Sequence, residues 1–255
     1  MTQLAKFGSL RGKRVFITGG GTGIGEGLAH AFHDLGNTVI VAGRTQASLD
    51  AASAGRERMH TVILDAADNA SVATAAETIA RDFPALNVVI HSAGIMSRNE
   101  LASGSLDQAL AAQIVNTNLL GTFRVIETFL PLVQGKPGAA LCTVSSGLAF
   151  VPFPTAPAYS ASKAAVHSYT VSLRQRLKGQ VEVIEIAPPA VQTGLTPGQA
   201  TKEGYMPLDA YIAETMANFS ANPTPSENLV GYVLPLRHAE RDDKVDQMLE
   251  MLGSL

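Results

Sequence analysis

The chain has 255 residues, of which 46% are hydrophobic and 16% charged, and its formal net charge is −3. This composition is typical of a globular protein and excludes a disordered chain, and without a dense basic patch we expect no nucleic acid partner. The single cysteine, Cys142, excludes an internal disulfide and fits a reducing compartment. The first residues lack an apolar segment of signal-peptide length, and no apolar stretch is long enough to span a bilayer. We therefore expect a cytoplasmic protein without a membrane partner.

Short β-branched runs alternate along the chain with longer alanine-rich stretches. Strands are predicted at 14–18, 38–42, 60–65, 87–91, 139–145 and 181–187. Helices are predicted at 24–35, 46–54, 69–82, 106–133 and 157–178. Continuous apolar strands separated by helices are typical of a parallel sheet that is covered on both faces. The sequence therefore predicts one α/β domain over residues 1–255: a doubly wound, Rossmann-type sheet of six or seven strands that binds ligands at the carboxyl ends of its strands.

A glycine-rich turn, TGGGTGIG, follows the first strand at 18–25. Its glycines do not fit the common G-x-G-x-x-G spacing and follow T-G-x-x-x-G-x-G instead. Glycine lets a ligand approach the backbone closely, and the N-terminus of the next helix offers free N–H groups to a pyrophosphate. Tight packing of the turn is the alternative interpretation. The residues expected to bind a dinucleotide here are Thr18, Gly19, Gly21, Thr22, Gly23, Ile24 and Gly25.

The end of the second strand indicates which dinucleotide is bound. An NAD site usually has an acidic residue about 20 positions beyond the glycines, where it binds the ribose 2′-hydroxyl. This chain has Arg44 there instead, followed by Thr45 and Ser48. A guanidinium group suits a 2′-phosphate, so we expect NADP(H) with Arg44 and Thr45 among its contacts. The alternative is that Arg44 is a solvated loop residue.

Tyr159 and Lys163 lie four residues apart in the segment YSASK, so on a helix their side chains leave the same face. One interpretation is a packed phenol beside a lysine whose ammonium group reaches water. The other is that the lysine makes the phenol a usable acid. The pKa of a free tyrosine is about 10, and bringing it to about 7 needs about 4 kcal/mol. One cation about 4 Å away supplies roughly that much at an effective dielectric constant of about 20.

Together these motifs resemble the short-chain dehydrogenase/reductase family. The resemblance rests on TGGGTGIG at 18–25, SAG at 92–94, NLLG at 118–121, the serine pair at 145–146 and YSASK at 159–163, and it covers nearly the whole chain. The segments LRHAER, PPAV and MPLDAYIAE are similar to the DltE-like branch of that family. The resemblance implies a homodimer or homotetramer that interconverts a carbonyl and an alcohol with NADP(H).

The resemblance also implies roles for individual residues. Tyr159 would be the acid and base, Ser146 would hydrogen-bond the substrate oxygen, and Lys163 would hold the nicotinamide ribose. Asn118 would hold a water that reprotonates the lysine. Each of these side chains also has a plain packing or capping role as its alternative. Further cofactor contacts are expected at Asp65, Ala66, Ser92, Ala93, Gly94, Pro188, Val191 and Thr193.

Two segments depart from the family pattern. The usual Asn-Asn-Ala-Gly after the fourth strand reads HSAG at 91–94, and the usual Pro-Gly after the sixth strand reads PP at 188–189. The asparagines normally join neighbouring backbone segments, so we expect His91 and Ser92 to make those contacts differently. A second proline fixes φ and removes an N–H, so the segment beside the nicotinamide should be rigid.

The chain end differs in character from the rest. A loop rich in Gly, Thr and Pro follows Val191, helical patterns recur at 208–219, 225–238 and 242–252, and no seventh strand is obvious. Because the loop leaves the carboxyl end of a strand, we expect a substrate lid around 192–220. A merely mobile connection is the alternative.

The residues expected to face the substrate are mostly apolar, and no arginine stands where it would clamp a carboxylate or a phosphate. We therefore expect a small or medium, largely uncharged ketone or aldehyde. Core packing explains Leu148 and Phe150 nearly as well. The expected substrate residues are Met96, Ser146, Leu148, Phe150, Tyr159, Pro189, Tyr205 and Met206.

No metal site is expected. His30 and His33 lie three residues apart on the first helix, but two ligands do not close a site, and a solvated helix face explains them. Cys142 lies in an apolar run without a charged neighbour, so we expect an inert, buried thiol.

Two other functions stay open at this point. A redox-sensing, NADP-binding regulator would bind NADPH without turnover, and it would not need aligned tyrosine, lysine and serine side chains. A nucleotide-sugar epimerase shares the glycine turn and the Y-x-x-x-K motif. Such epimerases usually carry a sizeable C-terminal substrate domain, for which the chain after Pro189 is too short.

Overall fold

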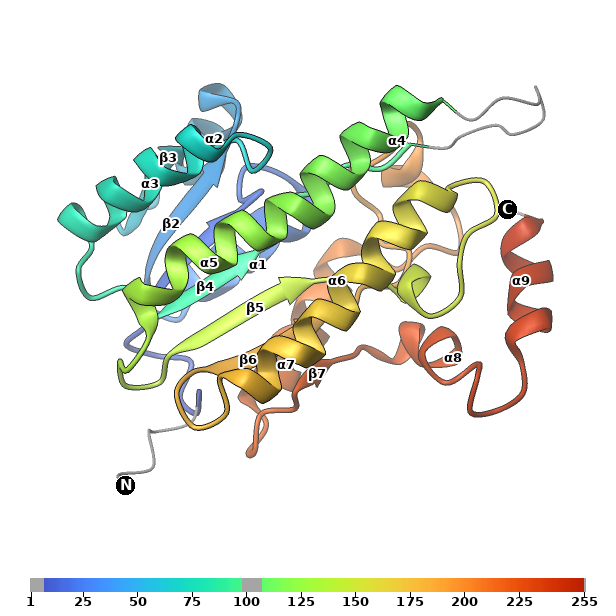
Figure 1. The fold of residues 1–255 in the computed structure, drawn as a ribbon. Coiled ribbons are helices and arrows are strands. Elements are labelled where there is room, and N and C mark those ends of the chain that lie inside the picture. The colour runs from blue at the N-terminus through green and yellow to red at the C-terminus, as the bar shows by residue number, and fades with distance from the viewer. Residues whose placement is uncertain (1–6, 98–106, 255) are drawn as a thin grey trace.

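Seven parallel strands form one sheet in the order β3-β2-β1-β4-β5-β6-β7, in a computed structural model that describes residues 7–97 and 107–254 (Figure 1). The strand order reverses between β1 and β4, so the carboxyl ends of these two strands flank the crevice where doubly wound sheets bind ligands. The predicted doubly wound fold is confirmed. The strands are β1 (Arg14–Thr18), β2 (Thr38–Gly43), β3 (Met59–Ile63), β4 (Val88–His91), β5 (Ala140–Val144), β6 (Glu182–Ile186) and β7 (Glu227–Asn228).

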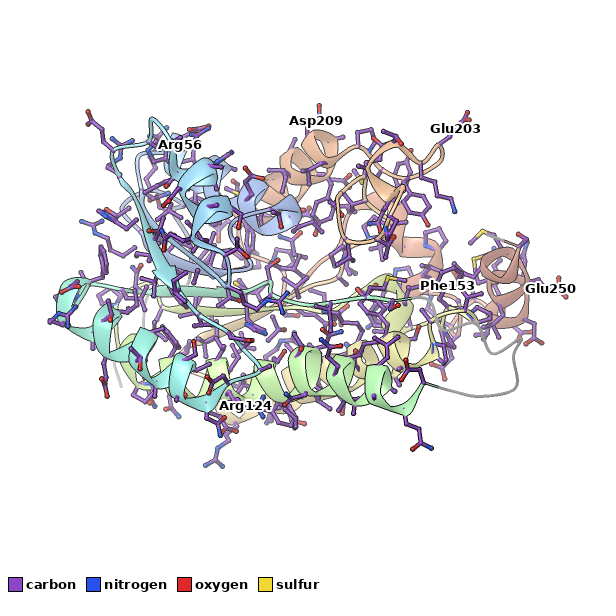
Figure 2. All side chains as sticks on the ribbon, turned by 90° about the horizontal axis from the view of Figure 1, so that it is seen from above. Arg56, Arg124, Phe153, Glu203, Asp209 and Glu250 are labelled. Atoms are coloured by element: carbon purple, nitrogen blue, oxygen red, sulfur yellow. The ribbon has the colours of Figure 1, made fainter. Side chains whose placement is uncertain are left out.

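Helices cover both faces of the sheet. Helices α1 and α7 pack on one face and α3, α5 and α6 on the other, and Figure 2 shows the sheet edge-on between these layers. A π-helical turn, Asn116–Leu120, separates α4 from α5. The helices are α1 (Gly23–Asp34), α2 (Gln46–Ser53), α3 (Asn69–Asp82), α4 (Gln108–Val115), α5 (Gly121–Val133), α6 (Pro157–Arg176), α7 (Leu208–Ser220), α8 (Leu234–Arg237) and α9 (Val245–Gly253).

The central strands are apolar along their whole length because both of their faces are buried. Along β1, Val15 and Ile17 enter the core beneath α1, whereas Phe16 enters the core beneath α5. There the ring of Phe16 stacks on that of Phe129, with ring centres 4.4 Å apart. This two-sided burial fixes where β1 ends, and therefore where the glycine turn begins.

Helix α6 is held on the sheet by polar contacts from one of its faces. The Lys163 Nζ donates to the Val144 carbonyl oxygen at 2.8 Å, and Arg174 Nε donates to a carbonyl oxygen of β6 at 3.0 Å. Between them, the Thr170 and Thr143 hydroxyl oxygens lie 2.7 Å apart. Spacings of seven and four residues place all three α6 side chains on the same stripe of the helix. The height and rotation of α6 against the sheet are therefore fixed at several turns.

The chain end differs from the sequence prediction. The segment 225–238, predicted as helical, forms β7, a short turn of 3-10 helix and the four-residue α8. The seventh strand is missed by sequence patterns because only two residues form it, through hydrogen bonds from the Glu185 and Ala187 N–H groups to Ser226 and Asn228. Likewise, the continuous helix expected over 106–133 is divided by the π-helical turn, and residue 106 lies outside the described residues.

The predicted lid covers two different kinds of structure. Helix α7 buries Tyr211 and Phe219 in the core beside α1, so it is part of the packed domain. In the preceding loop, Gly194, Leu195 and Gln199 border the cavity described below. A lid role therefore remains a prediction for the loop, and α7 anchors the far end of that loop. No helix within the described residues is long and apolar enough to cross a membrane.

Helix α9 covers the carboxyl edge of the sheet. Its Leu252 is 7% exposed and joins a small apolar cluster with Ile114 of α4, Phe153 and Tyr159. Phe153, from the loop before α6, lies on the side of α9 that faces the domain, whereas Glu250 of α9 points outward (Figure 2). The last helix thereby brings apolar side chains next to Tyr159.

Candidate active site

The glycine turn forms a tight backbone cradle after β1. Gly19 has φ +67°, and a Cβ there would lie 2.9 Å from the Ala93 backbone. A Cβ on Gly25 would lie only 2.2 Å from the Gly19 carbonyl oxygen. Only glycine permits this path. The next helix, α1, begins at Gly23, and Thr22 before it makes no side-chain capping hydrogen bond. The first N–H groups of α1 are therefore free of a side-chain cap, as phosphate binding requires.

The end of β4 is tied to this turn by a threonine and a histidine. Thr18 Oγ1 accepts the Ala93 N–H at 3.2 Å and lies 2.8 Å from His91 Nδ1. Burial, with a smaller effect from the Lys163 charge, lowers the pKa of His91 to about 3, so this imidazole is neutral. The contacts of His91 and Thr18 thus join β1 to β4 at the place where the family pattern has asparagines.

The serine, tyrosine and lysine of the motifs converge on one cavity of about 420 Å³. Ser146 follows β5, and its Oγ accepts the Leu148 N–H at 3.1 Å. Tyr159 and Lys163 lie one turn apart near the start of α6 and are only 7% and 5% exposed. The Lys163 Nζ lies 5.7 Å from the centre of the Tyr159 ring. Two separate elements, the end of β5 and the start of α6, therefore present these groups to the same space.

Burial dominates the acid–base properties of this group. It raises the pKa of Tyr159 to about 12, and the hydrogen-bonding Ser146 side chain only partly opposes this. Burial also lowers the pKa of Lys163 to about 8. The lowering of the tyrosine pKa toward neutrality expected from the sequence is therefore absent in the protein alone. The physical reason is that desolvation of the phenolate dominates, while the Lys163 Nζ is 5.7 Å from the ring centre, farther than the spacing argument assumed.

Asn118 is buried in the π-helical turn and fixes the loop after β4. Its Oδ1 accepts the Ile95 N–H at 2.8 Å, and its Nδ2 donates to the Ile95 carbonyl oxygen at 2.9 Å. A Cβ on Gly94 would lie 3.3 Å from Asn118 Oδ1 and 3.5 Å from Lys163 Nζ. Asn118 and Lys163 thus approach Gly94 closely, and the extra residue of the π turn brings the amide there.

A second cavity lies beyond the glycine turn, at the ends of β2 and β3. Arg44 lies at its rim with an exposed side chain and, within the described residues, has no carboxylate partner. The Asp65 Oδ1 accepts the Ala67 N–H at 2.9 Å, which orients that carboxylate in the wall. The predicted cofactor residues that border this cavity are Gly19, Gly21, Thr22, Arg44, Thr45, Asp65, Ala66, Ala93 and Gly94.

The predicted cofactor residues that border the first cavity come from the glycine turn and from the segments after β4 and β6. Thr193 is buried, and its Oγ1 accepts from Gln199 Nε2 at 3.2 Å, while the same nitrogen donates to the Val191 carbonyl oxygen at 2.8 Å. Gln199 was not singled out from the sequence, because an isolated glutamine in a Gly- and Thr-rich loop carries no pattern. The predicted residues here are Thr22, Gly23, Ile24, Gly25, Ser92, Pro188, Val191 and Thr193.

An apolar cavity of about 90 Å³ opens beside Tyr159 and Ser146. It is bordered by the predicted substrate residues Met96, Leu148, Pro189 and Tyr205. The other two predicted residues lie elsewhere. Met206 is buried in the main core, where its backbone pairs with Val191, and Phe150 packs against His167 and Arg237. Sequence reasoning missed Phe153, Leu195, Leu236 and Leu252 in this wall.

The remaining reactive side chains lie outside these cavities. Burial raises the pKa of the Cys142 thiol far above its ordinary range, which agrees with an inert thiol. His30 Nε2 lies 2.8 Å from the Ala52 carbonyl oxygen, and Arg56 contacts His33 at 3.2 Å. The expectation of a solvated face for these two histidines is wrong, because α2 and the loop after it pack against this side of α1.

Comparison with known proteins identifies the family. The family model for short chain dehydrogenases matches residues 13–204 of this chain. The chain belongs to the short-chain dehydrogenase/reductase family. The uncharacterised oxidoreductase DltE of Bacillus subtilis (strain 168) is 38% identical over 191 residues, which cover 74% of this short-chain dehydrogenase/reductase and 76% of DltE. The family and branch expected from the motifs are thereby confirmed.

Two solved structures show how far this short-chain dehydrogenase/reductase shares its fold. A short chain dehydrogenase from Burkholderia cenocepacia J2315 in complex with NADP has a TM-score of 0.81 at 23% identity, over 96% of this chain and 98% of that one. A short chain dehydrogenase/reductase from Burkholderia phymatum in complex with NAD has a TM-score of 0.78 at 20% identity, over 96% and 97%. At these identities the likeness concerns the fold.

Proposed function

We propose that this protein is an NADP(H)-dependent oxidoreductase that interconverts a carbonyl and an alcohol, with a small or medium, mostly uncharged ketone or aldehyde as substrate. The observation that carries the proposal is the convergence of Ser146, Tyr159 and Lys163 on a cavity that continues into the glycine turn. A protein that only needed a stable core would gain nothing from burying these three polar side chains together.

The residues present fit a nicotinamide dinucleotide. The Gly19 and Gly25 cradle and the uncapped start of α1 suit its pyrophosphate, and Lys163 and Thr193 lie where the nicotinamide end would be held. When bound, the nicotinamide supplies or accepts the hydride. Relatives of the same fold bind NADP or NAD, so a nicotinamide cofactor is supported, and the choice between the two must come from this chain.

Arg44 favours NADP(H) over NAD(H). Arg44 follows β2 at the rim of the second cavity, at the position where an NAD-binding protein usually has a carboxylate. Ser48 borders the same cavity. A guanidinium group at this point attracts a 2′-phosphate and forms charge-assisted hydrogen bonds with it. Asp65 and Ala66 border the same cavity and would contact the adenine end.

Tyr159 is the proposed proton donor in reduction. With its pKa raised to about 12, the phenol keeps its proton at neutral pH and can transfer it as charge develops on the carbonyl oxygen. Ser146 Oγ accepts the Leu148 N–H, which leaves the serine proton available for the same oxygen. After the transfer, the phenolate faces the Lys163 ammonium group.

Lys163 and Asn118 would restore the proton on the tyrosine. Lys163 donates to Val144 and faces Gly94 together with Asn118, which places an amide beside the ammonium group. We propose that Asn118 holds a water that returns a proton to Lys163. Its hydrogen bonds to Ile95 would keep that water position constant between turnovers.

The test is a panel of uncharged ketones and aldehydes, followed by NADPH absorbance and by product analysis. We expect reduction of at least one compact, apolar carbonyl compound, and loss of that activity in Tyr159→Phe. A redox-sensing regulator would instead bind NADPH and reduce none of the panel. An epimerase would keep its cofactor through turnover, whereas this protein should release NADP⁺. Quaternary structure, as a homodimer or homotetramer, stays a prediction.

A further inference from the structure

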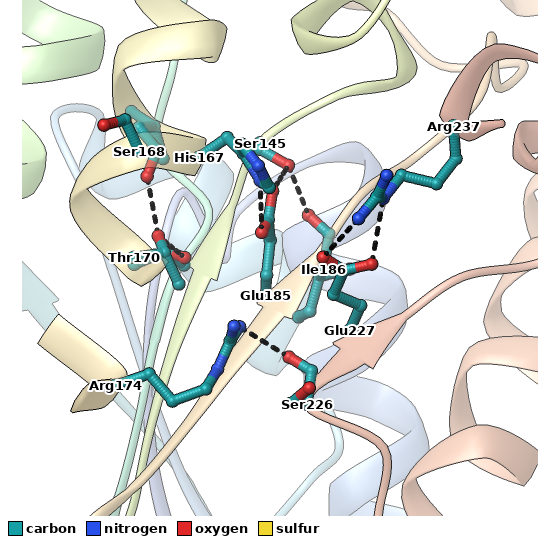
Figure 3. A network of polar contacts seen from close by, with 12 residues as sticks. Ser145, His167, Ser168, Thr170, Arg174, Glu185, Ile186, Ser226, Glu227 and Arg237 are labelled. Carbon is teal, nitrogen blue, oxygen red and sulfur yellow. Dashed lines mark hydrogen bonds and ion pairs between the residues drawn. The ribbon is translucent and has the colours of Figure 1, made fainter. Parts of the chain in front are cut away.

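A carboxylate is buried behind the candidate site and takes no part in the proposed chemistry. Glu185 lies near the carboxyl end of β6, between β5 and β7, and its side chain is 0% exposed. It accepts the Ser145 hydroxyl at 2.5 Å and lies 2.8 Å from His167 Nδ1 (Figure 3). Desolvation of a buried carboxylate costs several kcal/mol, which hydrogen bonds and a charged partner must offset. An apolar residue would serve the fold at lower cost.

This carboxylate joins the two elements that carry the candidate catalytic groups. Ser145 directly precedes Ser146, and it is held twice: its N–H donates to the Ile186 carbonyl oxygen at 2.9 Å, and its hydroxyl donates to Glu185. His167 lies on α6 one turn beyond Lys163, on the stripe that begins with Tyr159. Glu185 therefore links the residue after β5 to α6, in addition to the Lys163–Val144 and Thr170–Thr143 contacts, and it is the link that acts on Ser145, the neighbour of Ser146.

Charged groups from three elements face His167. They are Glu185 of β6, Glu227 of β7 and Arg237 of α8, and Arg237 makes a two-pronged ion pair with Glu227 at 2.9 and 3.0 Å. The ring of Phe150 lies between them, 5.0 Å from the His167 ring and 4.8 Å from the Arg237 guanidinium carbon. Phe150, which follows the short helical turn after Ser146, thus packs against the side chains of the same network.

The polar groups of this network are already paired with one another. Atoms of His167, Glu185 and Glu227 lie within 4.8 Å of one another, a spacing that a metal ion could also bridge. However, Arg237 already pairs with Glu227, and Ser145 and His167 already pair with Glu185. The network is therefore complete as a set of hydrogen bonds and ion pairs.

We propose that Glu185 and His167 are positioning residues, which act through Ser145 to aim Ser146 at the oxygen that Tyr159 protonates. The catalytic consequence rests on the proposed function, whereas the mechanical link from His167 to Ser146 does not. Neither residue touches the substrate in this scheme. Removing the link should lower kcat by between about 10- and 100-fold, the cost of a small misplacement of a reacting group, and leave KM for NADPH within about twofold.

The link should also respond to pH. The hydrogen bond to Glu185 raises the pKa of His167, against the opposing effect of burial, and the Glu185 and Glu227 charges add to the increase while Arg237 opposes it. A raised pKa means that the ion pair is fully formed below the ordinary histidine value of about 6.5 and is lost as pH rises through the raised value. The position of Ser146 should change over the same interval.

The first experiment compares Glu185→Gln with Glu182→Gln. Both change a glutamate of β6, but Glu182 begins the strand at the edge of the sheet opposite to the cavities, where it accepts the Phe7 N–H. We expect the kcat loss and an altered pH profile only in Glu185→Gln. Equal kcat and the same pH profile in Glu185→Gln and wild type would overturn the proposal. Should Glu185→Gln fail to fold, Ser145→Ala keeps the His167–Glu185 pair and should show the same kcat loss.

The second experiment does not depend on turnover. NMR titration of the NADPH complex should show the Ser146 and Leu148 amide signals moving with the His167 ring signals, with one common midpoint, and Ser145→Ala should uncouple them. Amide signals that ignore the His167 titration would refute the link. Failure of the wild type to reduce any carbonyl compound would refute the proposed function instead, and the titration would still decide whether His167 acts on Ser146.

Discussion

The Lys163 Nζ lies 5.7 Å from the centre of the Tyr159 ring and donates to the Val144 carbonyl oxygen at 2.8 Å. The lysine is thus attached to the end of β5, the strand that leads to Ser146. Both side chains are almost fully buried, and burial makes the phenol a weaker acid and the ammonium a stronger one. Both directions support the proposed roles, in which Tyr159 donates a proton and the charged Lys163 then stabilises the phenolate.

Replacing Tyr159 with phenylalanine should remove the proton donor and keep the packing of the ring. We expect kcat for carbonyl reduction to fall by about 10²- to 10⁴-fold, the usual contribution of general acid catalysis. The Kd for NADPH should stay within about twofold, measured by fluorescence titration. Tyr169→Phe is the matched control, since Tyr169 lies on the same helix against Phe123, away from the described cavities, and should keep full activity. Substantial activity in Tyr159→Phe would exclude the proton-donor role.

Carbonyl reduction should weaken in alkaline solution. Burial lowers the pKa of Lys163 to about 8, so the side chain is charged below that pH and neutral above it. Because the proposed role needs the charge, kcat should decline as pH rises through about 8, measured with saturating NADPH. In Glu185→Gln the effect of His167 on the pH profile should change, whereas the decline of kcat near pH 8 that is due to Lys163 should remain. A kcat that stays constant to about pH 10 would contradict a role for the lysine charge.

Arg44→Ala should change the preference between the two cofactors. Loss of one charge-assisted contact to a 2′-phosphate should weaken NADPH binding by about 10- to 100-fold, which corresponds to about 1.5 to 3 kcal/mol. NADH binding should change by less than about twofold, and both can be measured by calorimetry. Arg176→Ala, an exposed arginine at the end of α6, controls for a general loss of positive charge. Equal losses for NADPH and NADH would refute the phosphate assignment.

Leu252→Ala should enlarge the small apolar cavity beside Tyr159. Leu252 is 7% exposed and borders that cavity, so truncation should raise kcat/KM for ketones with a longer apolar substituent relative to the shorter ones. It should also reduce the free energy of unfolding by about 2 kcal/mol or more, measured by urea denaturation. Met251→Ala, at an exposed neighbouring position, should alter neither quantity. An unchanged order of substrates would mean that α9 does not limit substrate size.

Sequence patterns predicted the parts of the molecule that repeat a physical rule. Apolar runs located six strands, and glycines at 19 and 25 marked a turn that only glycine can follow. The Tyr159 and Lys163 spacing correctly placed both side chains on one buried face of α6. In each case the local sequence carries the signal, because the geometry depends on neighbours a few residues away.

Contacts between distant segments were not predictable in this way. Strand β7 is two residues long, and its partner on β6 defines it. Leu252 borders the cavity because α9 packs against Phe153 and Tyr159, and α9 lies beyond the segment matched by the family model. The pairing of Glu185 with His167 joins a strand to a helix across 18 residues, and neither residue stands in a recognisable motif. The pKa of Tyr159 depends on burial, which a spacing argument does not include.

The polar stripe on α6 sets which changes in length the protein can accept. Each residue of an α-helix turns the chain by about 100°, so one insertion or deletion between Lys163 and Arg174 would swing Thr170 or Arg174 away from the sheet. Descendants of this gene that acquire new substrates are therefore expected to vary the spacing of residues 194–206, where no comparable stripe exists among the described residues, and to leave the length of α6 untouched.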